Sequence, residues 1–188
     1  MKNIWSAFLI IFSGAFSQVV SSYEVITHEN LSEKALEAST LGKPGVLTRL
    51  GLKEVLKDES QQAFPNSDAT KQSINALFRS GASFEDNFPR STNHFFNPYN
   101  GQALSVSGVQ VGNPSPDWAL EDKGQIVGGL VLGGQEYSYR DGRSYFYLAL
   151  TSSSSVERDR RWDQMFQTLG QVIHHVQDMA QPHPMEPI

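Results

Sequence analysis

The chain has 188 residues, a formal net charge of −5 and no cysteine. This length corresponds to a single domain, and 39% hydrophobic with 19% charged residues is the composition of a globular protein rather than a disordered one. A pI of about 5.5 disfavours a broadly basic surface for duplex DNA. The lack of cysteine excludes a disulfide scaffold, a thiolate zinc site and a cysteine nucleophile. Any metal ion must therefore be bound by histidine, carboxylate or backbone groups.

The first 22 residues have the pattern of a signal peptide. Met1–Asn3 carries one lysine and precedes an apolar stretch over 4–16. This stretch is shorter than the roughly 20 residues of a membrane-spanning helix and suits the core of an export signal, with an uncleaved anchor as the alternative. Small residues allow cleavage before Gln18 or before Tyr23. We predict a signal peptide over 1–22, one domain over 23–188, and a secreted or periplasmic location.

Helical periodicity dominates the rest of the chain, so the predicted fold class is all-α. Apolar residues spaced three or four apart predict helices over 31–38, 46–56, 68–79, 141–150 and 156–180. The Gly-, Ser- and Val-rich segment 101–134 has no clean period and is predicted as irregular loop with short strands. A short helix is expected to begin near Asp117, after two prolines. No internal repeat or second domain is expected.

The last predicted helix places chemistry and packing on different faces. Its apolar residues fall at positions 162, 165, 166, 169, 172, 173 and 176 and form one stripe. His174 and Asp178 are four residues apart, so they share a second face, roughly opposite the stripe. His175 lies on neither face and is predicted to be a packing or surface residue.

Four of the five histidines occur in settings that suit a metal site. These are His28, His94, His174 and His183, with Asp86 and Asp178 as nearby carboxylates. A single histidine of this kind is more often a core or surface residue than a ligand. Together they supply the imidazole and carboxylate ligands that zinc takes when thiolates are absent. A Ser/His/Asp hydrolase is the competing interpretation, but the sequence has no G-x-S-x-G elbow.

The motifs resemble the zinc-dependent phospholipase C and single-strand-specific nuclease superfamily. The resemblance rests on Tyr23 to His28, on GASFED over 81–86, on NHFFNP over 93–98, on LGQVIHHVQD over 169–178 and on the QPH of 181–183. It implies an exported, multi-helix, all-α domain with up to three zinc ions in a cleft. The family has a downstream H-x-x-x-E for the third zinc, and none follows His183 here. We therefore expect two zinc ions and a domain whose C-terminal part is missing.

The resemblance also implies a role for each matching residue. The α-amine and carbonyl of Tyr23 would bind one zinc ion together with His28. Asp86, His94 and His174 would bind a second ion, and Asp178 would bridge the two. His183 corresponds to a ligand of the third ion, displaced by one position from the usual spacing.

The implied activity is phosphodiester hydrolysis by a metal-activated hydroxide, with a phospholipase C-like substrate preference and Asp86 as the general base. Two alternatives stay open: a single-strand-specific nuclease that stacks bases on Phe95, Phe96 or Tyr99, and an inactive remnant or non-catalytic zinc-binding protein. Glu85 is a helix-end or supporting residue, and Arg90 either meets a phosphate or pairs with a neighbouring carboxylate. The expected partner is a phospholipid or other phosphodiester, with single-stranded nucleic acid as an alternative and no stable protein partner.

Export should yield a mature protein that begins at Tyr23, because the resemblance requires a free α-amine there. An α-amine titrates near about 8, so a metal ion displaces its proton readily at neutral pH. N-terminal sequencing of the exported protein measures this directly. A chain that begins at Gln18 or Met1 would remove Tyr23 from the ligand set and leave the other ligands unaffected.

Overall fold

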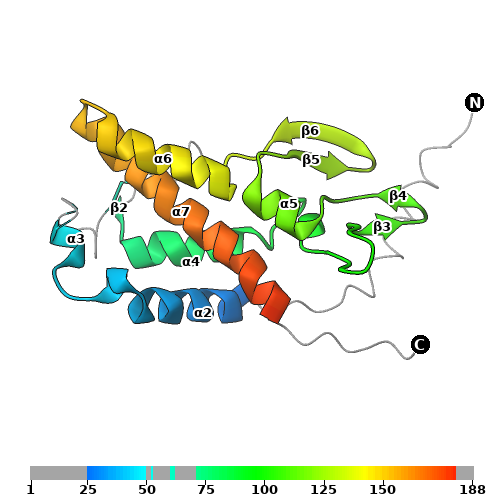
Figure 1. Cartoon of the computed structure of the whole chain (residues 1–188), viewed down its shortest axis with the longest axis horizontal. Helices are drawn as coiled ribbons and strands as arrows, with labels where there is room; N and C mark the ends of the chain where they lie inside the picture. Colours follow the sequence, from blue (N-terminus) through cyan, green and yellow to red (C-terminus); the bar gives the residue numbers. More distant parts are fainter. Residues whose placement is uncertain (1–24, 50–51, 53–59, 62–70, 181–188) are drawn as a thin grey trace, which may run out of the picture.

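A computed structural model describes residues 25–49, 52, 60–61 and 71–180 (Figure 1). The predicted signal peptide, Tyr23 and His183 lie outside these residues. Four longer helices form a bundle: α2 (Val25–Ala38), α4 (Ile74–Phe84), α6 (Tyr139–Thr151) and α7 (Ser155–Ala180). α7 is the central helix, because it packs against each of the other three.

The remaining helices are short. They comprise α3 (Val46–Arg49), α5 (Ser115–Leu120) and the 3-10 helices η1 (Thr40–Gly42) and η3 (Arg90–Asn93). The described part of the chain is thus mainly helical, as the sequence predicts. Within it, no helix has both the length and the apolar character of a membrane span.

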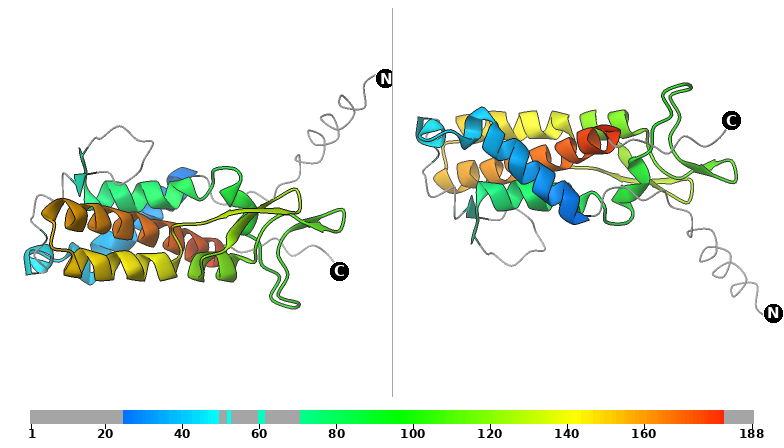
Figure 2. Two further views of the ribbon diagram at one scale, coloured as in Figure 1. Left: turned by 90° about the horizontal axis from the view of Figure 1, so that it is seen from above. Right: turned by 90° about the horizontal axis from the view of Figure 1, so that it is seen from below.

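Three antiparallel strand pairs accompany the helices. They are β1 (Ser60–Gln61) with β2 (Lys71–Gln72), β3 (Ser105–Val106) with β4 (Val109–Gln110), and β5 (Gly124–Val127) with β6 (Leu130–Gly134). The segment predicted as loop with short strands therefore contains two hairpins. Both turn through two consecutive residues with positive φ, Ser107-Gly108 and Gly128-Gly129, as the tightest hairpin turns require. Both hairpins project beyond the bundle at one end (Figure 2).

The helix boundaries differ from the sequence prediction by more than two residues in three helices. α3 ends at Arg49 and Leu52 is not helical, so the helix predicted over 46–56 is wrong beyond its first turn. α2 begins at Val25, six residues before the predicted start. α4 begins at Ile74, where the Oγ of Ser73 accepts a hydrogen bond from the Ala76 amide at 3.0 Å, and it continues beyond Gly81 to Phe84. Glycine ends many helices, but Gly81 is a contact point with α7 instead.

The apolar core occupies only one half of the bundle. It lies between α3, the start of α4, the end of α6 and the first half of α7, and consists of Leu47, Leu52, Ile74, Leu77, Ala149, Trp162, Met165 and Phe166. In the second half of α7 the buried side is polar and includes Gln171, His174 and Gln177, whereas Val176 is exposed. The predicted apolar stripe therefore packs against the core only in the first half of α7.

α4 and α7 cross so closely that two glycines meet the opposing backbone. A Cβ added at Gly81 would overlap the carbonyl of Gln167, and one added at Gly170 would overlap the carbonyl of Phe78. Neither position has room for a side chain. The contact fixes the position of each helix along the axis of the other. It therefore also fixes the positions of the residues that follow Gly81 and Gly170.

Gly170→Ala should lower the free energy of unfolding by about 1–3 kcal/mol, because overpacking forces the two backbones apart. This loss is expected even though alanine is intrinsically the better helix former by about 1 kcal/mol. Urea denaturation checks the value. Gly133→Ala is the control: nothing lies within 4 Å of its added Cβ, so stability should change by no more than about 0.5 kcal/mol. Equal losses in the two variants would contradict the close crossing.

Candidate metal centre

Five of the seven predicted ligands come together at one end of the bundle. His28 lies in the first turn of α2, Asp86 in the turn after α4, and His94 directly after η3. His174 and Asp178 lie in the last turns of α7. The two other predicted ligands, Tyr23 and His183, lie outside the described residues.

The ring of His174 is oriented by the close helix crossing. Its Nδ1 lies 2.7 Å from the carbonyl oxygen of Ala82, the residue after Gly81. A carbonyl only accepts hydrogen bonds, so Nδ1 carries the proton that it donates. In the neutral ring the lone pair is then on Nε2, which faces Asp178 and His94. Backbone orientation of this kind is typical of metal-ligating histidines.

His28 is held in the same way by a side-chain amide. Its Nδ1 donates to Oε1 of Gln177 at 2.7 Å, and the amide nitrogen of Gln177 donates to Oγ of Ser32 at 3.0 Å. His28, Ser32 and Gln177 are all buried. The Nε2 of neutral His28 consequently presents its lone pair to Oδ1 of Asp178, 3.4 Å away.

Four donor atoms are spaced like the ligands of a single tetrahedral ion. Nε2 of His174 lies 3.3 Å from Nδ1 of His94, and each of these nitrogens lies 3.2 Å from Oδ2 of Asp178. Oδ1 of Asp86 lies 3.8 Å and 3.7 Å from the same two nitrogens. Ligands held about 2.0–2.2 Å from a tetrahedral zinc ion are roughly 3.3–3.6 Å apart. Five of the six separations among these atoms, from 3.2 to 3.8 Å, are therefore close to those that one ion requires.

Asp178 faces two groups of donors at once. Its Oδ2 faces His94 and His174, and its Oδ1 faces His28. The rings of His28 and His174 are stacked, with their centroids 3.8 Å apart. One carboxylate thus joins two groups of donor atoms that could each face a cation.

The electrostatics of the cluster favour a cation at its centre. Burial and the neighbouring His174 lower the pKa of His28. Burial, followed by His175 and His174, lowers the pKa of His94 to about 3. At neutral pH both rings are then uncharged, and the lone pair on Nε2 of His28 repels Oδ1 of Asp178 unless a proton or a metal ion intervenes.

Without a metal ion, a proton on His174 partly offsets the negative charge of the carboxylates. Burial opposes a charge on His174, but the hydrogen bond to Asp178 and the carboxylate charges outweigh it and raise the pKa of His174. Burial likewise opposes the charge of Asp178, and the histidines outweigh it and lower its pKa to about 2. Burial raises the pKa of Asp86. Among the described residues, Oδ2 of Asp86 and Nε2 of His94 have no hydrogen-bond partner although they are buried.

A buried ion pair between Arg90 and Glu85 lies next to the cluster. Glu85 is 1% exposed and accepts hydrogen bonds from Arg90 and from Nε1 of Trp118 at 3.2 Å. Arg90 also donates to Gln171 at 2.7 Å and to Gln135 at 3.1 Å. Of the two roles that the sequence left open for Arg90, the structure shows pairing with a carboxylate. Glu85 is a supporting residue at the helix end, as predicted.

His175 packs within this support. It is 2% exposed, its Nδ1 lies 2.9 Å from Oγ of Ser115, and its Nε2 lies 3.6 Å from Oε2 of Glu85. Glu85, His94 and His175 form a further group of close donor atoms. Burial alone would raise the pKa of Glu85, but Arg90 and His175 hold it well below its usual range. Because Arg90 already neutralises this carboxylate, the group is less suited to a cation than the cluster around Asp178.

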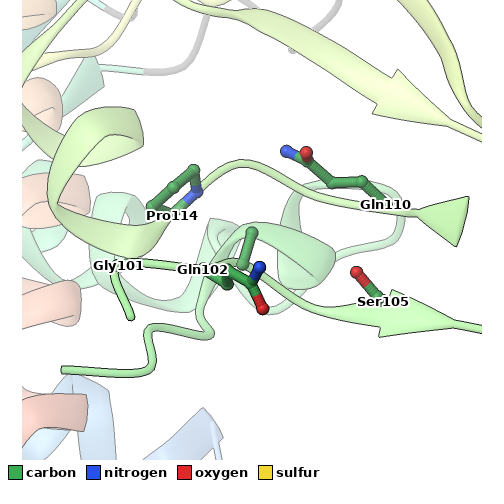
Figure 3. Close-up of a pocket in the computed structure, with 6 residues that line it drawn as sticks. Gly101, Gln102, Ser105, Gln110 and Pro114 are labelled. Atoms are coloured by element: carbon green, nitrogen blue, oxygen red, sulfur yellow. The ribbon is translucent and has the colours of Figure 1, made fainter. Parts of the chain in front are cut away.

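A separate hollow lies beside the β3–β4 hairpin (Figure 3). It is lined by Gly101, Gln102, Ala103, Ser105, Gln110 and Pro114. These residues carry neither charge nor imidazole, so the hollow offers no strong metal ligand and no countercharge for a phosphate. The histidine cluster is the stronger candidate for a functional site.

Comparisons with protein-family models, with curated proteins and with solved structures found no match for this chain. What the cluster does must therefore be inferred from its own chemistry. The described residues include groups of histidine and carboxylate side chains that could hold a metal ion.

The orienting groups were not predicted from the sequence. Gln177 and Ser32 are ordinary helix residues, and the Ala82 carbonyl has no side-chain signature at all. The one sequence feature that points to such groups is the number of polar residues over 171–178, on a helix whose other residues form an apolar stripe. A buried polar helix face implies partners elsewhere in the chain, but it does not say which ones.

Asp178→Asn should weaken zinc binding, because it removes the charge shared by the two positions. With zinc at about 100 times its dissociation constant, binding stabilises the folded wild type by about 2.7 kcal/mol, and the variant should lose most of this. Thermal unfolding with zinc and with chelator measures the difference. Asp159→Asn makes the same change at an exposed position on α7 and should retain the full zinc effect. A variant at Asp178 that is stabilised as strongly as the wild type would exclude this residue as a ligand.

Proposed function

We propose that the chain is an exported zinc-dependent phosphodiester hydrolase, similar to the phospholipase C branch of the superfamily that its motifs resemble. The observation that carries the proposal is the convergence of two oriented imidazole lone pairs, from His28 and His174, on opposite oxygens of Asp178. Without a metal, a proton on His174 relieves the repulsion at only one oxygen of Asp178. Two adjacent divalent ions would remove the repulsion at both positions.

The donor set suits zinc. It contains nitrogen and carboxylate ligands only, and the ring nitrogens of His94 and His174 lie 3.2–3.8 Å from oxygens of Asp86 and Asp178, close to the spacing of tetrahedral coordination. Bound zinc would lower the pKa of water toward about 7 and offset the charge of a phosphodiester.

The protein's own groups would have distinct roles. His94 and His174 hold one ion with Asp86, while His28 holds the other, and Asp178 fixes the separation between them. Asp86 also faces solvent, with 16% of its side chain exposed. Its Oδ2 is buried and has no hydrogen-bond partner among the described residues, so it could accept a proton from a water molecule bound within the site, and its raised pKa suits general-base action.

The negative charge of a phosphodiester would have to be neutralised by the metal ions themselves. Arg90 is engaged with Glu85, Gln135 and Gln171 and is not directed at a ligand. The acidic net charge of −5 favours a phospholipid over a polyanionic nucleic acid. Tyr99 is 97% exposed, so base stacking on its ring is the feature that a nuclease would use.

A non-catalytic zinc-binding protein is the second candidate, and one observation favours it. Four protein donors surround the position between His94, His174 and the two aspartates, and closed four-ligand sites are usually structural. The position beside His28 differs, because only His28 and Asp178 of its three close donors are left for it once His174 binds the other ion. An ion at that position would keep open places for water.

The purified protein, loaded with zinc, should hydrolyse a soluble chromogenic phosphodiester, lose this activity in chelator and regain it with zinc. Asp86→Asn should lower the turnover about 10²–10⁴-fold, the usual contribution of a general base, while zinc content changes less than in Asp178→Asn. Phosphatidylcholine and single-stranded DNA, assayed in parallel, separate the two substrate classes. Tight zinc binding without hydrolysis of any of the three substrates would favour the non-catalytic alternative.

A further inference from the structure

Two hairpins project from the end of the bundle where the histidine cluster lies (Figures 1 and 2). One is β3–β4 and the other is β5–β6. They also touch each other, because a Cβ added at Gly129 in the second turn would lie 3.2 Å from Cγ1 of Val109 in β4. The hairpins therefore form a joint projection next to the cluster.

This projection has no charged side chain. The sequence contains no Asp, Glu, Lys or Arg over 91–116 or over 124–135, the two stretches that contain the hairpins. At the chain's average of 19% charged residues, stretches of this length would contain several. Charged side chains are one of the means by which exposed hairpins avoid edge-to-edge association in water, and their absence here favours a non-aqueous surrounding.

The β5–β6 hairpin is apolar on both faces. Ile126 pairs with Val131, and Val127 pairs with Leu130. Paired residues point to the same side and successive residues to opposite sides. The two pairs thus lie on opposite faces of the ribbon. Leu130, Val131 and Leu132 are 70%, 71% and 51% exposed.

A surface that is apolar on both faces distinguishes between possible partners. A flat protein surface covers one face of a ribbon and leaves the other in water, whereas the interface of a bilayer surrounds both. The β3–β4 hairpin adds Val106 and Val109, which are 46% and 48% exposed. Tyr99, nearly fully exposed, is of the amphipathic aromatic type that is enriched at membrane interfaces.

We propose that these two hairpins insert into the outer layer of a lipid bilayer and hold the metal cluster at the level of the lipid headgroups. β6, with five residues, spans roughly 16 Å, and interfacial segments are buried about 5–10 Å deep. Insertion of the hairpin tips therefore leaves the base of the projection, and the cluster beside it, near the phosphates. The identity of the substrate in this proposal rests on the proposed function, but lipid binding by the hairpins does not.

Vesicle binding tests the proposal. The protein used begins at Tyr23, which retains every residue that the structure describes, and the vesicles are phosphatidylcholine. The zinc-loaded protein should cosediment with the vesicles, and it should still do so in chelator. The double variant Leu130→Ser/Leu132→Ser should bind at least about tenfold more weakly, because two apolar side chains are lost from the inserted surface.

Leu150→Ser is the matched control. Leu150 is 58% exposed near the end of α6, away from the hairpins, and its variant should bind as the wild type does. Unchanged circular dichroism in all variants shows that they fold. Hydrolysis of a soluble phosphodiester should be the same in the wild type and both variants.

The possible results separate the two proposals. No vesicle binding by the wild type, or equal binding by the wild type and the hairpin variant, overturns lipid insertion, even if soluble phosphodiester is hydrolysed. Vesicle binding that depends on the hairpins supports insertion, even if no hydrolysis occurs. A wild-type dimer that becomes a monomer in the hairpin variant, without vesicle binding by either, identifies the surface as a contact between copies and also overturns the proposal.

Discussion

The close contact between α4 and α7 is the constraint on which the cluster of histidine and carboxylate side chains depends. Gly81 and Gly170 let the two backbones touch, and this fixes both the register and the rotation of the helices. The carbonyl of Ala82 then lies where it orients His174, and the turn after α4 brings Asp86 to the same place. A wider crossing would leave the ligands on separate surfaces.

The bundle divides its interior between stability and chemistry. In one half, Trp162, Phe166 and Leu77 form an apolar core. In the other half, buried glutamines, histidines and carboxylates pair only in part, with Arg90 neutralising Glu85 while Oδ2 of Asp86 and Nε2 of His94 have no hydrogen-bond partner in the part of the chain that the structure describes. Buried polar groups are costly unless paired. The apolar half offsets this cost, so the polar half can hold donors in positions that favour a cation.

The hairpins and the cluster are complementary in character. The cluster concentrates charge and lone pairs, while the projection beside it has no charged residue at all. A substrate with a charged phosphate next to an apolar body would meet both surfaces at once. This combination links the two proposals physically, although each depends on different residues.

The sequence by itself determined the mainly helical fold, the long last helix and the sharing of one face by His174 and Asp178, because these follow from periodicity along a single element. It also gave the candidate ligands His28, Asp86 and His94, but only as separate points on the chain. Tertiary structure decided that these side chains meet, that Gln177 and Ala82 set which ring nitrogen of each histidine faces Asp178, and that Arg90 binds Glu85. It also decided that the last half of α7 buries its polar face and that α4 continues through Gly81. Such features depend on contacts between elements distant in the chain, and local periodicity carries no information about those contacts.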